Sequence, residues 1–396
     1  MQVSQSASQR ILDASFDARR LTEIKGRWVL GSTLFSPLMM RGLELSNRIV
    51  VSPMAQYSAE DGCVSEWHLM HLGNLSVSGA GLLIIEASAV HPRARLSPND
   101  MGLWSDANAA ALEPAIKFCR KFGGAKLGLQ LWHAGRKGSV TVAWEGQRPI
   151  AIDKGGWTPA GASAIPYPGR NTPAALDADG IRSTIQDHVD AAKRADALGL
   201  DLIEIHGAHG YLIHNFLSPT TNKRTDIYGG SLENRMRFGL ELFRAVRDVW
   251  PERKPLGVRI STTDWVNGGW EVEDSIEFVH KLKALGCDYV TASSGGSVPE
   301  QRLNVYPGYQ VPNGEKIRKA TGMCTMAVGL ITEPRQAEEI LTSCKADLVA
   351  LGRGMLYNPR WPWHAAVELG EEFFYPKQYE RSHPVMRAGD FLKPAR

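Results

Sequence analysis

The sequence has few cysteines, and none of them is spaced for a metal site. Five occur among the 396 residues, at positions 63, 119, 287, 324 and 344, and no CxxC pair is present. An odd number of scattered cysteines argues against a disulfide framework and a structural zinc site, and is typical of a reducing compartment. We therefore expect a cytoplasmic protein that holds no metal.

Long apolar runs and dense positive charge are also missing. No apolar stretch reaches the roughly 18 residues that a membrane-spanning helix needs. The net charge is +3 without a Lys/Arg cluster, which argues against nucleic acid or a membrane surface as partner. The first residues lack the apolar core of a secretory signal, and acidic residues within 10–27 argue against a transit peptide. We expect residues 1–33 to form an N-terminal arm.

Short apolar runs of strand length recur along the chain, with helical patterns between them. Most are continuously apolar, which is the pattern of parallel strands that are covered on both faces. Eight strands alternating with helices predict an α/β fold, a single (β/α)8 TIM barrel over residues 34–370. The competing doubly wound sheet would need a GxGxxG turn after an early strand, and none occurs there. The eight runs are Arg48–Val51, Leu82–Glu86, Leu127–Leu131, Leu202–His206, Leu256–Ile260, Tyr289–Ala292, Thr325–Val328 and Leu348–Leu351.

One helix, between the last two runs, can be placed from its start signals. Thr332 and Pro334 mark its beginning. Apolar residues then recur at helical spacing and predict a buried stripe. The stripe consists of Ala337, Ile340, Leu341 and Cys344.

Residues 134–176 interrupt this alternation of strands and helices. The segment is rich in glycine and proline and contains Trp144 and Trp157, but it shows no clear period. A loop this long in a compact domain is usually functional or disordered. Because it follows the third strand, we expect it to cover the mouth of the barrel as a lid. A mobile insertion without a role is the alternative.

Polar residues where the strands end are the candidates for the active site, which in this fold lies at the C-terminal ends of the strands. Glycines after the seventh and eighth strands fit a phosphate site, which FMN or a sugar phosphate would satisfy equally. The candidates are Ser52-Pro53-Met54-Ala55-Gln56-Tyr57, Glu86-Ala87-Ser88, Gln130, His133, His206, His209, Tyr211, Arg259, Gly329 and Gly352-Arg353.

The fourth strand ends in two histidines and a tyrosine. His206 and His209 could aim their N–H groups at one carbonyl or nitro oxygen, and Tyr211 could give a proton to a developing carbanion. With His214, the histidines are also numerous enough to bind zinc, although no Asp or Glu in the run offers a further ligand. We favour the polarising role and expect His214 to be structural.

Two further strand residues have open interpretations. Arg259 could offset the negative charge of a reduced flavin, or form a salt bridge at the rim of the barrel. Gln130 could direct its amide at a pyrimidine edge, or be a satisfied amide of the core.

Several longer motifs resemble one family. The run HGAHGYLIHNFLSPTTNKRTDIYGGSLENRMRF (His206–Phe238) is similar to the signature of the old yellow enzymes. The runs NRIVVSPMAQYS (Asn47–Ser58), LQLWHAGRK (Leu129–Lys137) and ALGRGML (Ala350–Leu356) also resemble that family, in its order. The resemblance covers roughly Leu34 to Arg381. It is closest to the thermophilic-like and xenobiotic-reductase branch, in which the position of His209 is histidine.

The resemblance implies a non-covalent FMN over the barrel mouth and NADPH or NADH as reductant. It places Ser52, Pro53, Met54, Ala55 and Ala87 beside the isoalloxazine, Gln130 and Arg259 at its polar edge, and Gly329, Gly352 and Arg353 at the phosphate. Tyr57, His206, His209 and Tyr211 would face the substrate. The implied reaction is a ping-pong reduction of an activated alkene by an ene-reductase, with Tyr211 as proton donor.

The sequence departs from the family's pattern at Ala55, where many close relatives have cysteine. In the tail, residues 371–396, Arg381 resembles a residue that reaches into a neighbouring subunit's site. The resemblance therefore implies a homodimer or homotetramer. A flavin enzyme acting on an amine, nitro compound or nitrate ester is the alternative within the family. A metal-dependent barrel hydrolase and a flavin-binding protein without turnover are the alternatives outside it.

Overall fold

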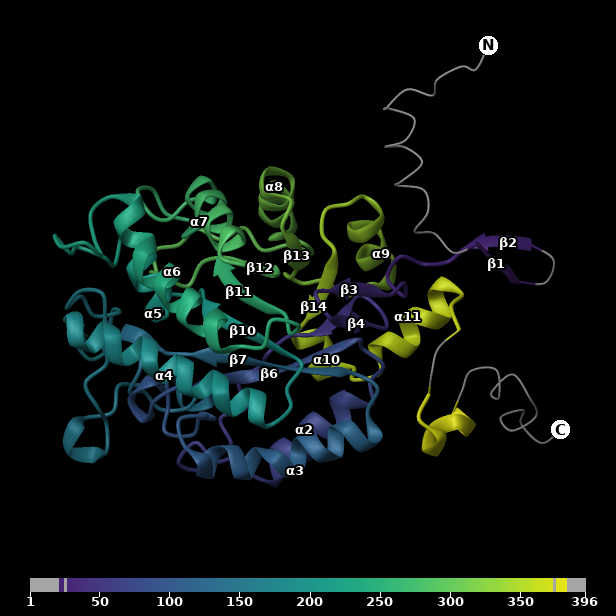
Figure 1. Ribbon diagram of the computed structural model, residues 1–396, viewed down its shortest axis with the longest axis horizontal. Coiled ribbons are helices and arrows are strands. Elements are labelled where there is room, and N and C mark those ends of the chain that lie inside the picture. The colour runs from purple at the N-terminus through teal and green to yellow at the C-terminus, as the bar shows by residue number, and fades with distance from the viewer. Residues whose placement is uncertain (1–20, 25–26, 373–374, 383–396) are drawn as a thin grey trace, which may run out of the picture.

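The computed structural model describes residues 21–24, 27–372 and 375–382, and its centre is a closed barrel of parallel strands (Figure 1). Pairing of the last strand with the first, through Val349↔Ile49 and Leu351↔Val51, closes the sheet. All eight predicted strands and the (β/α)8 fold are confirmed. In chain order the strands are β5 (Ile49–Val51), β6 (Leu82–Ala89), β7 (Lys126–Trp132), β10 (Leu202–Gly207), β11 (Leu256–Ser261), β12 (Tyr289–Ser293), β13 (Cys324–Ala327) and β14 (Leu348–Leu351).

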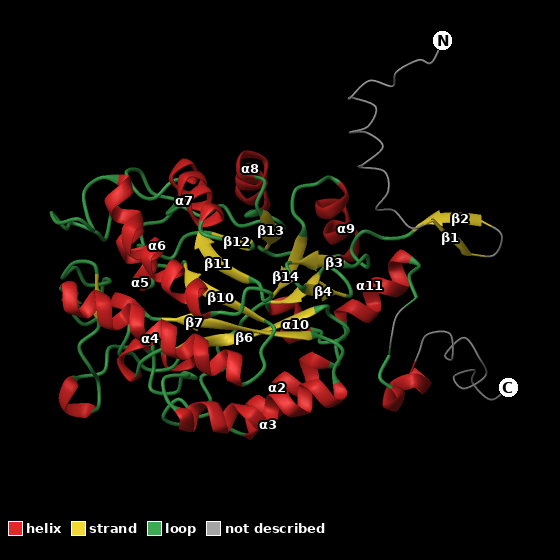
Figure 2. Ribbon diagram, viewed as in Figure 1, coloured by secondary structure: helices red, strands yellow, loops and turns green. Residues whose placement is uncertain are grey.

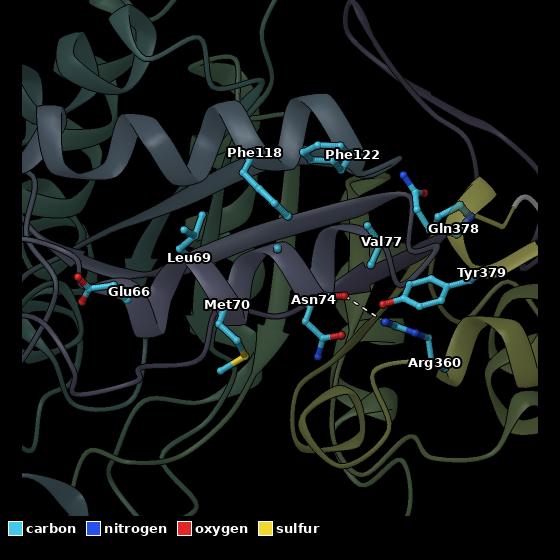
Figure 3. A pocket seen from close by; sticks show the side chains of 12 residues that line it. Glu66, Leu69, Met70, Asn74, Val77, Phe118, Phe122, Arg360, Gln378 and Tyr379 are labelled. Carbon is cyan, nitrogen blue, oxygen red and sulfur yellow. Dashed lines mark hydrogen bonds between the residues drawn. The ribbon is translucent and has the colours of Figure 1, made fainter.

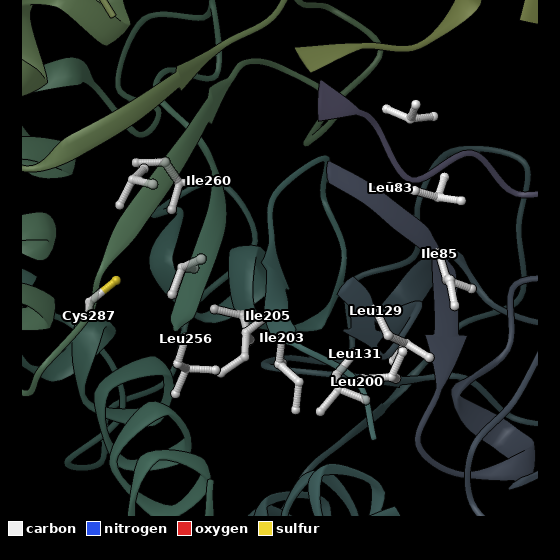
Figure 4. Close-up of a cluster of buried hydrophobic side chains, with 14 of the residues drawn as sticks. Leu83, Ile85, Leu129, Leu131, Leu200, Ile203, Ile205, Leu256, Ile260 and Cys287 are labelled. Carbon is white, nitrogen blue, oxygen red and sulfur yellow. The ribbon is translucent and has the colours of Figure 1, made fainter. Parts of the chain in front are cut away.

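Helices surround the barrel and cover the outer faces of its strands (Figure 2). Leucine and isoleucine side chains such as Leu83, Ile85 and Leu129 form the buried layer between strands and helices (Figure 4). Burial of this layer supplies the main driving force for wrapping the helices around the sheet. The surrounding helices are α2 (Glu66–Ser76), α3 (Asp106–Phe122), α4 (Ala178–Ala197), α6 (Leu232–Val249), α7 (Val272–Ala284), α8 (Val311–Thr321), α9 (Pro334–Thr342) and α11 (Trp361–Leu369), with the short α5 (Leu212–Leu217) and α10 (Arg353–Tyr357).

A hairpin closes the N-terminal end of the barrel. Its strands β3 (Leu38–Met40) and β4 (Leu43–Leu45) pack against the first inward-facing residues of the barrel strands, such as Leu82 and Leu348. Tyr289 is fully buried in the same inner cluster. A Cβ on Gly257 would lie 2.3 Å from the Tyr289 ring, so glycine is needed there. With this end plugged, the open end of the barrel is its C-terminal one.

The predicted stripe of α9 is correct except at its last position. Ala337, Ile340 and Leu341 are buried, but the helix ends at Thr342. Cys344 is exposed and has a φ of 56°, in the turn towards β14. Its assignment to the buried stripe was wrong, because the apolar period continues in the sequence beyond the point where the backbone leaves the helix.

The insertion between β7 and α4 has little regular structure. Three short 3₁₀ helices and the two-residue pair β8 (Ala160–Gly161) and β9 (Ala174–Ala175) are its described elements. Trp157 is buried, whereas Trp144 is 70% exposed. Gly135 has a φ of 60°, and a Cβ there would lie 2.6 Å from Asn215 Oδ1. The start of the insertion is therefore packed closely against the segment after β10.

The expected N-terminal arm and C-terminal tail lie partly outside the described residues. Within them, β1 (Leu21–Ile24) and β2 (Arg27–Leu30) form an antiparallel hairpin. The last described element is the 3₁₀ helix η5 (Lys377–Ser382). No helix in the described ranges has the length and apolar character to cross a membrane.

Two buried histidines make the stability of the fold sensitive to acid. His133 and His188 are 8% and 1% exposed. Burial lowers the pKa of His133 to about 3 and that of His188 to about 4. The His188 ring is held by the Thr184 carbonyl oxygen at 2.8 Å from Nδ1. Both rings are therefore neutral in the folded protein at pH 5, where the unfolded chain binds protons at these positions.

We expect His188→Gln to reduce the acid sensitivity of folding. Histidine in the unfolded chain has a pKa of about 6.5, so stability present at pH 7 is lost as the pH falls from there towards 4. Between pH 7 and 5 the wild type should lose about 1–2 kcal/mol more unfolding free energy than the variant. Denaturant titrations at both pH values measure this loss. The exposed His280→Gln should keep the wild-type slope; an unchanged slope in His188→Gln would contradict the expectation.

Candidate active site

Two adjoining cavities lie at the C-terminal end of the barrel. Their volumes are about 570 and about 140 Å³. Pro53, His209 and Arg259 line both, so the two spaces meet at these side chains. This is the end at which barrels of this type hold their active sites.

Most of the site residues predicted from the sequence line these cavities; Gln56, Glu86, Ser88, His133 and Arg381 do not. The larger cavity is lined by Ser52, Pro53, Met54, His209, Arg259, Gly329, Gly352 and Arg353, among others. The smaller is lined by Pro53, Ala55, Tyr57, Ala87, Gln130, His206, His209, Tyr211 and Arg259, with Leu96 and Trp132. Arg381 is exposed in η5 and lines neither cavity of its own chain.

His206 and His209 form a hydrogen-bonded pair. The Ala208 N–H donates to His206 Nδ1 at 3.2 Å, so we assign the ring proton of neutral His206 to Nε2. That nitrogen lies 3.2 Å from His209 Nδ1, and His209 Nε2 lies 2.7 Å from Ser293 Oγ. Burial and the nearby charge of Arg259 hold the pKa of both histidines well below 6.5. Both imidazoles are thus neutral hydrogen-bond donors at physiological pH.

Tyr211 closes one side of the smaller cavity. Its ring packs edge-on against His206 and Trp132, with centroid distances of 4.9 and 5.0 Å. Burial raises the pKa of Tyr211, and the proximity of Tyr57 and Asp100 raises it further. The phenol therefore keeps its proton at neutral pH and can deliver it only to a strong base, such as a carbanion.

Two cavity residues adopt a left-handed backbone that is uncommon for side chains other than glycine. Tyr57 has a φ of 51° and His209 a φ of 58°. His209 is held in this conformation at both backbone ends, because its N–H donates to Ser261 Oγ at 2.9 Å and its carbonyl accepts from Lys137 Nζ at 2.8 Å. Strained conformations of this kind concentrate at functional sites and persist only where neighbours enforce them.

His214 and Asn215 hold in place the loop after β10 that carries His209. Fully buried His214 accepts the Gly210 N–H at Nδ1, and its Nε2 lies 2.9 Å from Asp264 Oδ1. Asn215 Nδ2 donates to the Gly210 carbonyl at 2.9 Å. Neither side chain lines a cavity, which agrees with the structural role expected for His214.

A buried polar cluster forms the floor beneath the two cavities. Gln130 Nε2 donates to Glu204 Oε1 at 2.7 Å, and Thr291 Oγ1 donates to the other carboxylate oxygen. Burial raises the pKa of Glu204, against the opposing effects of the Arg259 charge and these hydrogen bonds. Because the amide N–H₂ of Gln130 is directed at Glu204, its Oε1 is the group left to accept a hydrogen bond from a ligand.

The residues present fit a flat anionic cofactor with a phosphate. Arg259 lies half-buried at the junction of the cavities, and its buried Nε has no hydrogen-bond partner among the described residues. Its cation and the Gln130 acceptor match the polar edge of a flavin. At the other end, Gly329, with a φ of 114°, and Gly352 expose bare backbone beside Arg353, as a phosphate requires.

Sequence reasoning missed the wall of the larger cavity that follows β12. Ser293, Ser294 and Gln310 line it, and Gln310 Oε1 accepts from Ser294 Oγ at 2.7 Å. The strand-end rule could have found the two serines, because Ser293-Ser294-Gly295-Gly296 directly follows the sixth apolar run. Gln310 carried no such signal, since it lies far along the chain before α8.

No cysteine of the described chain lines either cavity. Ala55, at the position where the family resemblance implies cysteine in many relatives, lines the smaller cavity. Cys63 does not substitute for it, since its Sγ accepts from Asn108 Nδ2 at 3.4 Å outside both cavities.

A third hollow, of about 530 Å³, lies away from the barrel mouth (Figure 3). It runs between α2, α3 and the segment around η5, and Arg360 Nη1 bridges to the Asn74 carbonyl at 3.1 Å. Its apolar side chains Met70, Phe118 and Phe122 are 38–50% exposed. Contiguous exposed apolar surface is typical of protein contact sites.

Comparison with known proteins identifies the family. The sequence pattern of the NADH:flavin oxidoreductase / NADH oxidase family matches residues 33–372. The NADPH dehydrogenase of Geobacillus thermodenitrificans is 46% identical over 355 residues, which is 89% of this chain and 99% of that protein. The NADPH dehydrogenase of Halalkalibacterium halodurans is 44% identical over 351 residues, which is 88% of this chain and 98% of that protein.

Solved structures agree with the sequence comparison. Morphinone reductase superimposes with a TM-score of 0.72 at 28% identity, over 88% of this chain and 92% of its own. An old yellow enzyme homologue from Zymomonas mobilis gives a TM-score of 0.71 at 25% identity. The superposition covers 87% of this chain and 94% of that one. Because the family pattern spans most of the chain, this protein belongs to the FMN-dependent NADH:flavin oxidoreductase / NADH oxidase family, that of the old yellow enzymes.

Proposed function

We propose that this FMN-dependent NAD(P)H oxidoreductase is an ene-reductase that reduces the activated C=C bond of α,β-unsaturated carbonyl or nitro compounds in a ping-pong cycle. One observation carries the proposal. Two neutral imidazoles and a protonated phenol converge on a small cavity that adjoins the space suited to the flavin. A substrate there would meet hydrogen-bond donors at its oxygen and a proton source at its carbon.

The proposal divides the cavity residues into two groups. When bound, FMN supplies the site that accepts hydride from NADPH or NADH and passes it on to the alkene. Gln130 Oε1 and Arg259 would bind its polar edge, and Arg259 would balance the negative charge of the reduced ring. The ring face would lie against Ser52, Pro53, Met54, Ala55 and Ala87, and the phosphate against Gly329, Gly352 and Arg353.

The second group acts on the substrate. His206 and His209 would donate hydrogen bonds to its carbonyl or nitro oxygen. For this, the His206 Nε2–H must exchange His209 Nδ1 for the incoming oxygen, and the His209 Nε2–H must exchange Ser293 Oγ for it. Tyr211 would protonate the α-carbon once hydride reaches the β-carbon. Tyr57 would bound the cavity on the side of the insertion, with residues 134–176 as lid. Free cysteines accord with a cytoplasmic location.

We also propose a homodimer or homotetramer in which Arg381 completes the site of a neighbouring subunit. Arg381 is exposed on η5 and lines no cavity of its own chain. The segment that carries it borders the exposed apolar hollow on α2 and α3, which a second copy would cover.

The purified protein should be yellow and should carry FMN. Anaerobic NADPH should bleach the flavin absorbance, and cyclohexenone added afterwards should restore it, because the two half-reactions share one site. Stopped-flow absorbance measures both steps. A colourless protein that cannot be reconstituted with FMN contradicts the cofactor assignment. A flavin that NADPH reduces but no activated alkene reoxidises contradicts the ene-reductase proposal.

Tyr211→Phe should slow reoxidation by an enone about 100-fold or more, because it removes the proposed acid. Flavin reduction by NADPH needs no proton from this residue and should change little. Tyr57→Phe is the matched control, since it removes a hydroxyl from the same cavity without removing the acid. Equal losses in both half-reactions of Tyr211→Phe would exclude the role of acid.

Arg381→Ala should raise the KM of the enone, whereas the neighbouring Lys377→Ala should not. Co-expression of the Arg381→Ala chain with a Tyr211→Phe chain shows whether Arg381 serves the site of the neighbouring subunit or the site of its own. In a mixed dimer the Arg381→Ala chain keeps its Tyr211 and receives Arg381 from its partner, so one site of the dimer is complete. Activity above the sum of the two variants is expected. No recovery would contradict the intersubunit role.

A further inference from the structure

The insertion after β7 places three cations around one aromatic ring. Arg136, Lys137 and Arg170 lie over the face of Tyr167, with distances of 5.6, 4.7 and 5.1 Å to its centroid. Two of the cations come from η2 (Gly135–Lys137) and the third from the turn that follows Tyr167. One ring therefore gathers positive charge from two segments of the insertion.

None of these three cations forms a salt bridge with a carboxylate in the part of the chain that the structure describes. Their hydrogen bonds go chiefly to backbone carbonyl oxygens, and the carboxylates that act on Arg136, those of Asp264 and Glu300, do so from beyond ion-pair distance. Arg136 is only 3% exposed. Buried cations are ordinarily paired, because burial without a counter-ion is costly.

The cations also repel one another. Burial, together with the charges of Arg170 and Arg136, lowers the pKa of Lys137 to about 7. Burial likewise lowers the pKa of Arg136 to about 10. An anion placed among the three would remove this repulsion and hold the Lys137 proton in place.

The cluster borders the smaller cavity rather than a remote surface. Lys137 Nζ lies 5.5 Å from the ring centroid of Tyr211 and donates to the His209 carbonyl. The charge of Arg170 acts on Tyr211 and Tyr57, which both line that cavity. The three side chains are not part of the cavity lining itself, so an anionic group on a bound molecule would meet them at the cavity's edge, beside Tyr211.

We propose that Arg136, Lys137 and Arg170 form an anion subsite at the edge of the substrate cavity. The subsite takes an anionic oxygen group, either a carboxylate on the alkene substrate or a phosphate of the nicotinamide coenzyme. The assignment rests on the proposed function, because it deepens the description of what the same cavity binds. The subsite predicts that anionic substrates or coenzymes bind more tightly than neutral or less charged ones. The histidine pair and Tyr211 alone would not produce this preference.

Arg170→Gln tests the subsite, with Arg170→Lys as the variant that keeps the charge. The matched control is Arg148→Gln, which removes one positive charge from an exposed position of the same insertion. Two pairs of partners separate the sources of the anion: a cyclohexenone that carries a remote carboxylate and its methyl ester, and NADPH and NADH. The readouts are the KM of each and the Kd of tetrahydro-NADPH and tetrahydro-NADH from the perturbation of the flavin spectrum.

In Arg170→Gln, the KM or Kd of the anionic member of at least one pair should rise about tenfold, as loss of a charge-assisted contact implies. The KM or Kd of the neutral or less charged member should change less than about threefold. In Arg170→Lys, the KM or Kd of the anionic member should return most of the way to the wild-type value. A carboxylate effect points to the alkene, and an effect confined to NADPH points to the coenzyme. In the wild type, Kd of the anionic probe should also rise with ionic strength.

Equal losses for both members of each pair would overturn the proposal, because the cations would then only hold the insertion in place. The proposal would also be overturned if Arg148→Gln raised the KM or Kd of the anionic partners as much as Arg170→Gln does. The rise would then reflect the net charge of the protein and not a contact with the anion. Failure of the proposed ene-reductase function can be told apart from failure of the anion subsite. Binding of the tetrahydronicotinamides needs no turnover, so the coenzyme arm reads the subsite even if no alkene is reduced.

Discussion

Closure of the sheet through the pairing of β14 with β5 is the constraint on which the rest of the structure depends. It brings the ends of all the strands into one ring, so residues more than 200 positions apart in the sequence line one space. Ser52 and Gly352 belong to the same cavity for this reason. The hairpin of β3 and β4 fills the opposite end, which leaves one mouth for chemistry.

Charge at this mouth is arranged asymmetrically. Beneath the cavities, buried Glu204 offsets Arg259 and directs the amide of Gln130. Above them, the insertion contributes Arg136, Lys137 and Arg170 without a paired carboxylate among the described residues. The site is therefore electropositive overall, which suits a cofactor with a phosphate and a reduced ring that is negative. Burial, aided by the charge of Arg259, lowers the pKa of His206 and His209, so they act as hydrogen-bond donors without a net charge.

The sequence predicted the barrel, most of the lining of the smaller cavity and part of the lining of the larger one, because these depend on local signals. Apolar runs locate strands, and the polar residues near their C-terminal ends, such as Gln130 and Arg259, must lie at the mouth once the strand count is known. Contributions from loops were harder to predict. Gln310 and the cluster around Tyr167 reach the site only through tertiary packing, and no period or spacing marks them. The mutual hydrogen bond of His206 and His209 likewise depends on the left-handed backbone of His209.

Isotope labelling of the reaction product tests the central claim most directly. With the transferable hydrogen of NADPH replaced by deuterium, and the reaction run in ordinary water, NMR should find deuterium at the β-carbon of the reduced enone. The α-carbon should carry hydrogen from water, delivered through Tyr211. Deuterium at the α-carbon, or its absence from the product, would contradict hydride transfer through the flavin to an alkene held between the histidine pair and Tyr211.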